Sequence, residues 1–247
     1  MTGRLPSYYR AAIVPVELRG GLCDLCRTPV AEEFQFCYQC SQQLIAHPDL
    51  AGFVTYAVKG RQSGTDMHRY KDQRPSPQAL ENVFLLLKHG LTHLRCAGQL
   101  LGTPVRAVTV MPSRSHYQAG TPSQFQRLCA RTLPEDTPTV SLRPTQGSAS
   151  DRRVHGDAFE VIVDHTDMSH VVLIDDTWVS GGTALSAVAS LQKAGAHQVS
   201  VLVLARWLDP AYGATRDFLT LRSQVPGWRQ PQDVCPFTLD GSCPASG

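Results

Sequence analysis

The 247-residue chain lacks three features, and each absence excludes a class of protein. No apolar run reaches the roughly 18 residues of a membrane-spanning helix, so we expect no membrane span. Residues 1–10 contain no apolar stretch of signal-peptide length, which predicts a cytoplasmic protein. The net charge is only +2, so the overall basic excess of many nucleic-acid-binding proteins is missing. With 42% apolar and 18% charged residues, the composition is that of a globular chain rather than a disordered one.

Cysteine is too sparse, at eight residues, for a disulfide scaffold, but four cysteines fall within 18 residues. Their spacing is C-x2-C-x10-C-x2-C. Each CxxC turn directs two thiolates toward one centre, and two such turns complete the tetrahedron of soft donors that Zn²⁺ prefers. We therefore predict a structural zinc ribbon over residues 18–46, with a short strand at 33–36; buried or disulfide-linked thiols are the alternative. The predicted zinc ligands are Cys23, Cys26, Cys37 and Cys40.

The other four cysteines are scattered along the chain. Two fall in predicted helices, where we expect small buried apolar residues. Two fall in a proline-containing C-terminal segment, where we favour free thiols over a mutual disulfide. His89 and His93 have the spacing of an HExxH zinc motif, but no Glu follows His89, so we reject a zinc-protease site. In chain order these cysteines are Cys96, Cys129, Cys235 and Cys243.

Strand and helix patterns alternate after the ribbon, which predicts an α/β domain over residues 50–208. We expect a mostly parallel sheet with helices on both faces. The unbroken apolar run 171–174 suits a central strand buried on both sides. Residues 209–247 are predicted to form a C-terminal helix and an irregular tail. The predicted strands are 52–58, 105–111, 139–143, 158–163, 170–175 and 198–205, the predicted helices are 79–101, 121–131, 183–194 and 211–221, and 59–77 is a polar stretch.

Residues 171–183 (VVLIDDTWVSGGT) carry the most chemical information. Asp175 and Asp176 follow a buried strand, and ligands bind beyond the carboxyl ends of strands in open α/β sheets. Two carboxylates there suit a vicinal diol or a cation. Residues 180–183 offer backbone N–H groups at a helix N-terminus, where the helix dipole favours an anion and the glycines allow close approach. A diol at one end and a phosphate at the other describe a ribose 5-phosphate.

This order of four apolar residues, two acids, three further residues and Ser-Gly-Gly-Thr resembles the phosphoribosyl pyrophosphate (PRPP) motif of type I phosphoribosyltransferases. It is not a P-loop, because the lysine of that motif is missing. With a predicted zinc ribbon ahead of it, the chain resembles the ComF-like phosphoribosyltransferases, which are named for a role in DNA uptake during competence. The resemblance covers roughly residues 18–206.

Shorter segments extend the resemblance. Tyr70-Lys71 resembles the family's YK segment, although a surface role for Lys71 is the favoured interpretation. Residues 110–114 (VMPSR) lie where a pyrophosphate-binding loop follows a strand. Residues 152–159 resemble the end of a flexible loop that closes over the substrate. The chain departs from the family at Trp178, which predicts a narrower pocket or a ring stacked on a ligand.

The resemblance implies a type I phosphoribosyltransferase fold and a Mg²⁺-dependent transfer of phosphoribose from PRPP to an unidentified nitrogen nucleophile, with release of pyrophosphate. Glutamine-dependent synthesis of phosphoribosylamine is not expected, because residue 2 is Thr and no N-terminal Cys nucleophile is present. The alternative is a non-catalytic PRPP-sensing or competence accessory protein, with single-stranded DNA or competence proteins as partners. The acceptor and the oligomeric state stay open.

The residues implied in catalysis are Asp175, Asp176, Arg114, Arg152 and Arg153. Those implied in PRPP binding are Asp175, Asp176, Thr177, Ser180, Gly181, Gly182, Thr183 and Ser113.

Overall fold

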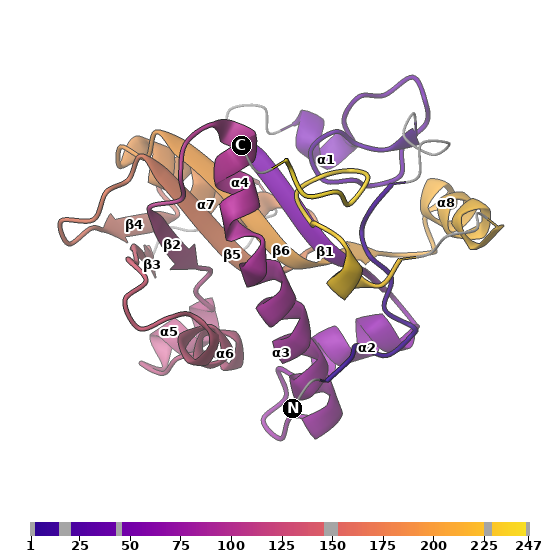
Figure 1. Cartoon of the computed structure of the whole chain (residues 1–247), viewed down its shortest axis with the longest axis horizontal. Helices are drawn as coiled ribbons and strands as arrows, with labels where there is room; N and C mark the ends of the chain where they lie inside the picture. Colours follow the sequence, from indigo (N-terminus) through magenta and orange to yellow (C-terminus); the bar gives the residue numbers. More distant parts are fainter. Residues whose placement is uncertain (1–2, 15–20, 43–45, 146–152, 225–228, 246–247) are drawn as a thin grey trace.

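The computed structural model describes residues 3–14, 21–42, 46–145, 153–224 and 229–245 (Figure 1). Four strands form a sheet in the order β1-β6-β5-β2, and each pairing between neighbours is parallel. The strands of this sheet are β1 (Leu50–Val58), β2 (Ala107–Val110), β5 (His170–Trp178) and β6 (Gln198–Leu208). A separate antiparallel pair is formed by β3 (Ser141–Pro144) and β4 (Phe159–Ile162).

Helices cover both faces of the parallel sheet, because side chains of the central strands alternate between two cores (Figure 1). On β5, Val171 and Leu173 belong to the core that α7 completes, whereas Val172 and Ile174 belong to the core of α3, α4 and α6. The predicted α/β class with a mostly parallel sheet is confirmed. The helices are α1 (Tyr38–Ser41), α2 (Gln62–Arg69), α3 (Pro77–Thr92), α4 (Leu94–Leu101), α5 (Arg114–Gln118), α6 (Gln124–Thr132), α7 (Gly182–Lys193), α8 (Gly213–Gln224) and the 3₁₀ turn η3 (Pro231–Asp233).

The start of α6 shows how a local signal sets a helix end. We expected Thr121 as the N-cap, but the N-cap is Ser123. The Gln126 N–H donates to Ser123 Oγ at 3.2 Å, and the Ser123 N–H donates to Gln126 Oε1 at 2.9 Å. This reciprocal capping box satisfies two backbone donors at once. The helix therefore begins after Ser123 and not at Thr121-Pro122, where the predicted helix 121–131 starts.

The prediction of a polar stretch over 59–77 missed α2. This helix has little apolar surface, and the buried Asp66 side chain attaches it to the rest of the domain. The Asp66 carboxylate accepts hydrogen bonds from the Tyr9 hydroxyl at 2.8 Å and from the Asn82 amide at 2.9 Å. These partners are distant in sequence, so no periodic pattern could reveal them.

Two further local predictions are wrong. Residues 33–36 form a turn rather than a strand, and the Phe34 N–H donates to the Ala31 carbonyl at 2.9 Å. The single helix predicted over 79–101 is two helices, α3 and α4, separated at His93 with φ −101° and ψ 7°.

The C-terminal segment is irregular apart from η3, as predicted, yet it packs closely on the domain. Val234, Cys235 and Phe237 are all buried. The Phe237 ring lies so close to Gly52 of β1 that a Cβ there would come within 2.6 Å of it. Within the described ranges, no helix is long and apolar enough to span a bilayer.

Candidate functional site

The carboxyl ends of β5 and β2 border a cavity of about 370 Å³. Asp175 and Asp176 line it from β5, and Ser113 lines it from the loop after β2. Tyr70 and Lys71, which directly follow α2, line another wall. The two acids and Ser113 therefore come together at the end of the sheet where ligands of open α/β folds bind.

The Asp176 carboxylate is contacted by one ammonium donor and one hydroxyl donor. Lys71 Nζ lies 2.6 Å from Asp176 Oδ2, and the Tyr70 hydroxyl donates to the same oxygen. Lys71 is exposed, as expected of a surface lysine, and it also lines the cavity and pairs there with Asp176. Burial, followed by the charge of Asp176, raises the pKa of Tyr70 well above its usual value.

Asp175 is more deeply placed and is 8% exposed. Its Oδ1 accepts the Asp176 backbone N–H at 2.8 Å. Burial, and then the Asp176 carboxylate, raise the pKa of Asp175 to about 7, while the Lys71 ammonium lowers it. A carboxyl poised at this pKa accepts or holds a proton near neutral pH, and a cation or a diol entering the cavity favours its charged form.

The loop between β5 and α7 ends at Gly181, the N-cap of α7, which adopts a left-handed conformation with φ 85° and ψ −15°. No side chain caps this helix end. Because the first backbone N–H groups of a helix have no partner within it, this end offers donors to an anion. Gly182 is buried and Thr183 is exposed.

Trp178 is directed into the core rather than toward a ligand. It is 1% exposed, and its ring packs edge-on against Phe53 with centroids 5.7 Å apart. A Cβ at Gly181 would come within 2.6 Å of Trp178 Cε2. The expectation that Trp178 narrows the pocket or stacks on a ligand is therefore wrong, because its ring forms the floor beneath the glycine loop.

Other predicted site residues lie apart from the cavity walls. Ser180 lines a separate hollow of about 730 Å³ beside the cysteine segment. Thr177 Oγ1 is buried and has no hydrogen-bond partner among the described residues. Arg114 begins α5 directly after Ser113, and its side chain lies outside the description.

The predicted flexible loop is described only from residue 153 onward, and Arg152 lies outside the described residues. Arg153 is exposed. Just after it, the His155 N–H donates to Ser186 Oγ of α7 at 3.0 Å. This end of the loop is thus attached one turn into the helix that starts at Gly182.

Four further cavity residues were not predicted. They are His116 of α5, Ser123 at the N-cap of α6, and Gln124 and Phe125 of α6. Their place after β2, beyond the carboxyl end of a sheet strand, is the one signal in the sequence that could have found them. Cys129 of α6 is buried as predicted, and burial followed by the charges of Asp176 and Asp175 raises its pKa to about 12.

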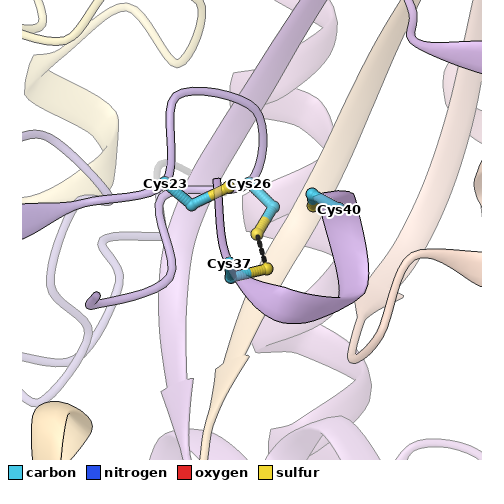
Figure 2. Close-up of side chains that lie close together, drawn as sticks. All are labelled: Cys23, Cys26, Cys37 and Cys40. Atoms are coloured by element: carbon cyan, nitrogen blue, oxygen red, sulfur yellow. Dashed lines mark hydrogen bonds between the residues drawn. The ribbon is translucent and has the colours of Figure 1, made fainter. Parts of the chain in front are cut away.

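The four N-terminal cysteines converge on one point (Figure 2), and their sulfur atoms all lie within 4.8 Å of one another. Cys26 Sγ and Cys37 Sγ are 3.7 Å apart. A tetrahedral zinc with Zn–S bonds of about 2.3 Å sets its sulfur atoms roughly 3.8 Å apart, whereas a disulfide requires about 2.05 Å. The cluster therefore fits a zinc ion and not a disulfide pair.

One buried side chain joins this cluster to the glycine loop. Arg206 of β6 is 4% exposed. Its Nε donates to the Cys26 carbonyl at 2.7 Å, and its Nη1 donates to the carbonyls of Trp178 at 2.8 Å and Val179 at 3.1 Å. The cysteine segment and the end of β5 are consequently positioned by one guanidinium.

Comparison with known proteins identifies no matching family model and no matching curated protein. Solved structures that resemble the chain are phosphoribosyltransferases. They include hypoxanthine phosphoribosyltransferase from Trypanosoma cruzi (11% identity, 51% of this chain and 65% of that chain, TM-score 0.30). Adenine phosphoribosyltransferase from Saccharomyces cerevisiae matches at 17% identity over 63% of this chain and 80% of that chain, with TM-score 0.33. The enzyme from L. donovani matches at 13% over 51% and 71%, with TM-score 0.29.

The chain thus spans about two thirds of the length of the T. cruzi protein, 65%. At these TM-scores, the case for any chemistry rests on the residues of the site.

Proposed function

We propose that the chain binds PRPP and Mg²⁺ and transfers phosphoribose to a nitrogen nucleophile, with release of pyrophosphate, on a type I phosphoribosyltransferase fold. One observation carries the proposal. The acid pair Asp175-Asp176 lies near the carboxyl end of a central parallel strand and lines a cavity, and a glycine-initiated helix follows at Gly181. This is the order in which a ribose 5-phosphate presents its diol and its phosphate.

The acids and the glycine loop have separate roles in this proposal. Asp175 and Asp176 accept the ribose hydroxyls, and Asp176 releases its present bonds to Lys71 and Tyr70 as it does so. The 5′-phosphate binds the backbone N–H groups at residues 180–183, joined by the hydroxyls of Ser180, Thr183 and Thr177, the last of which has no partner among the described residues.

The pyrophosphate group is assigned to the opposite wall. Ser113 lies in the cavity, and Arg114 follows it at the start of α5. Lys71 lines the cavity, and in this proposal its ammonium exchanges the Asp176 carboxylate for a phosphate oxygen. Arg152 and Arg153 belong to a loop that closes over the substrate and keeps water from the reacting carbon.

Two metals accompany this function. The carboxylates of Asp175 and Asp176 are hard oxygen donors of the kind that hold Mg²⁺ together with phosphates, and Mg²⁺ neutralises charge on the leaving pyrophosphate. Zn²⁺ bound by the four cysteines of the ribbon (residues 18–46) holds that segment on the domain (50–208), and residues 209–247 complete the chain. With all four ligands from protein, this zinc has a structural role.

A non-catalytic PRPP-sensing or competence accessory protein is the second candidate. The observation that favours it is the occupation of Asp176 by both Tyr70 and Lys71, which competes with substrate for the acid. Single-stranded DNA would then be a partner rather than an acceptor.

Calorimetry of PRPP binding in the presence of Mg²⁺ tests the site. The Asp175→Asn/Asp176→Asn variant is expected to abolish Mg²⁺-dependent binding. The matched control is Asp164→Asn/Asp167→Asn, which alters two exposed acids just before β5 and leaves binding unchanged. Unchanged affinity in the Asp175/Asp176 variant would refute the proposed site.

Incubation with PRPP, Mg²⁺ and a panel of bases, amines and single-stranded DNA separates the two candidates. Pyrophosphate release with one acceptor supports the transferase. PRPP or DNA binding without release with any acceptor supports the accessory protein.

A further inference from the structure

A second group of histidine and cysteine side chains lies where the C-terminal segment meets the junction of α3 and α4. It consists of His93, Cys96, Cys235 and Cys243, and one ligand atom from each lies within 4.8 Å of the others. Two of these residues lie at the junction of α3 and α4, and the other two lie in the C-terminal segment more than 130 positions later. None of the four belongs to the ribbon or lines the cavity, so neither proposed function uses them.

The distances agree with tetrahedral zinc. His93 Nδ1 lies 3.6 Å from Cys96 Sγ and 3.6 Å from Cys243 Sγ. With Zn–S bonds of about 2.3 Å and a Zn–N bond of about 2.0 Å, a tetrahedral ion sets a sulfur and a nitrogen ligand roughly 3.6 Å apart. The ring nitrogen therefore stands at ligand spacing from both thiols.

We propose that His93, Cys96, Cys235 and Cys243 bind a second structural zinc ion. Three thiolates and one imidazole form a Cys3His donor set, which is one of the common structural zinc sites. The thiols of Cys96 and Cys235 are buried, and that of Cys243 is exposed, so an ion reaches the site from the Cys243 side. Zinc binding releases the thiol protons to solvent.

The junction of α3 and α4 contains two of the proposed ligands. His93 ends α3 and precedes α4, and its carbonyl accepts the Cys96 N–H at 2.9 Å. His-x2-Cys therefore makes the same tight turn as a CxxC pair, with both ligand side chains directed to one side.

The tail supplies its two cysteines through a closed loop. The Cys235 N–H donates to the Gly241 carbonyl at 2.8 Å, which returns the chain and brings Cys243 back to Cys235. Gly241 has φ 78°, and a Cβ there would come within 2.8 Å of Val234. Both facts require glycine at this position, so the loop geometry that joins the two thiols is specified by the sequence.

Neighbouring groups hold the ligands in place. His89 Nε2 lies 2.8 Å from the Val234 carbonyl, next to Cys235, and its ring packs edge-on against His93 with centroids 4.8 Å apart. Arg27 Nη2 donates to the Pro236 carbonyl at 2.9 Å. The tail is thereby joined to α3 on one side and to the ribbon segment on the other.

A disulfide accounts for less of this geometry. It would join two of the three thiols and leave the third thiol and the imidazole with no role at ligand spacing. A zinc ion binds all four side chains, and it joins the C-terminal segment, which contains Phe237, to α3 and α4. The proposed site therefore attaches the C-terminal segment to α3 and α4.

Zinc analysis of the full-length chain, purified under reducing conditions, tests the proposal. We expect about two zinc ions per chain, one for each four-ligand cluster. Cys243→Ser is expected to lower this to about one, and Cys37→Ser to lower it to about one by the loss of the ribbon ion. Cys129→Ser is the matched control: it alters a buried cysteine outside both clusters and retains the wild-type zinc content.

Cadmium NMR of the wild-type chain supplies a readout that needs no variant. Two resonances are expected, one with the chemical shift of four sulfur ligands and one shifted toward three sulfurs and a nitrogen. A single four-sulfur resonance, a wild-type zinc content of one that Cys243→Ser leaves unchanged, or an intact mass of the non-reduced chain that shows a disulfide among Cys96, Cys235 and Cys243 would each overturn the proposal. Loss of the ribbon zinc alone would leave it standing and would instead contradict the ribbon.

Discussion

Gly181→Ala tests whether the Trp178 ring sets the shape of the glycine loop. The change has two costs in this structure. Gly181 has φ 85°, and placing an L-residue in the left-handed region costs about 1–2 kcal/mol. The new Cβ would also come within 2.6 Å of Trp178 Cε2, and such overpacking in a core costs about 1–3 kcal/mol. We expect the free energy of unfolding to fall by about 2–5 kcal/mol in total.

Gly195→Ala separates the two costs. Gly195 follows the other end of α7 with φ 101°, and a Cβ there would meet nothing within 4 Å. This variant carries the backbone cost alone, so it is expected to lose about 1–2 kcal/mol. The difference between the two glycine variants measures the ring contact.

Urea denaturation of the zinc-loaded protein, followed by circular dichroism, gives both values. In a Trp178→Leu background the overpacking is relieved, so Gly181→Ala is expected to cost about 1–3 kcal/mol less than in the wild type. PRPP affinity should fall in Gly181→Ala and stay unchanged in Gly195→Ala. Equal destabilisation by Gly181→Ala and Gly195→Ala would show that Trp178 does not support the loop.

Two other perturbations follow from the same region. Asp175 has its pKa raised to about 7 in the folded chain, against about 3.9 in an unfolded one. Between about pH 4 and 7 the folded state therefore binds the extra proton, so the free energy of unfolding falls as pH rises through this window. In Asp175→Asn the free energy of unfolding is expected to depend less on pH, and the variant should be more stable than wild type at pH 8. The same pH dependence of unfolding in the variant and the wild type would contradict the raised pKa of Asp175. Arg206→Lys keeps the charge but cannot span the carbonyls of Cys26 and Trp178, so it should cost about 3 kcal/mol, at about 1.5–3 kcal/mol for each charged hydrogen bond. It should also weaken PRPP binding in calorimetry. The exposed control Arg216→Lys should change neither the free energy of unfolding nor the PRPP affinity.

The features that the sequence predicted well are local ones. The apolar run of β5, its two acids and the glycine loop lie within residues 171–183, so strand, turn and helix could be read in order. The spacing of the four ribbon cysteines likewise predicted a cluster that the structure brings together. In both cases a short stretch of chain contains most of the geometry.

The features that it did not predict depend on distant partners. Lys71 meets Asp176 across 105 positions, and apart from the resemblance of Tyr70-Lys71 to a short family segment, its neighbours in the sequence do not indicate this contact. The strand predicted at 33–36 is absent because no neighbouring strand pairs with it in the described structure. Arg206 lies just beyond the strand predicted at 198–205, and its contacts appear only when the fold places Cys26 beside it.

The sequence by itself determined the α/β class, the acid pair before a glycine loop and the cysteine ribbon, because each is set by periodicity or spacing within one segment. Tertiary structure alone decided that Trp178 faces the core and that Lys71 enters the cavity. It also decided that His93, rejected as part of an HExxH motif, lies with Cys96, Cys235 and Cys243. These outcomes depend on which segments the folded sheet brings together, and side chains 150 residues apart, such as His93 and Cys243, have no shared pattern along the chain.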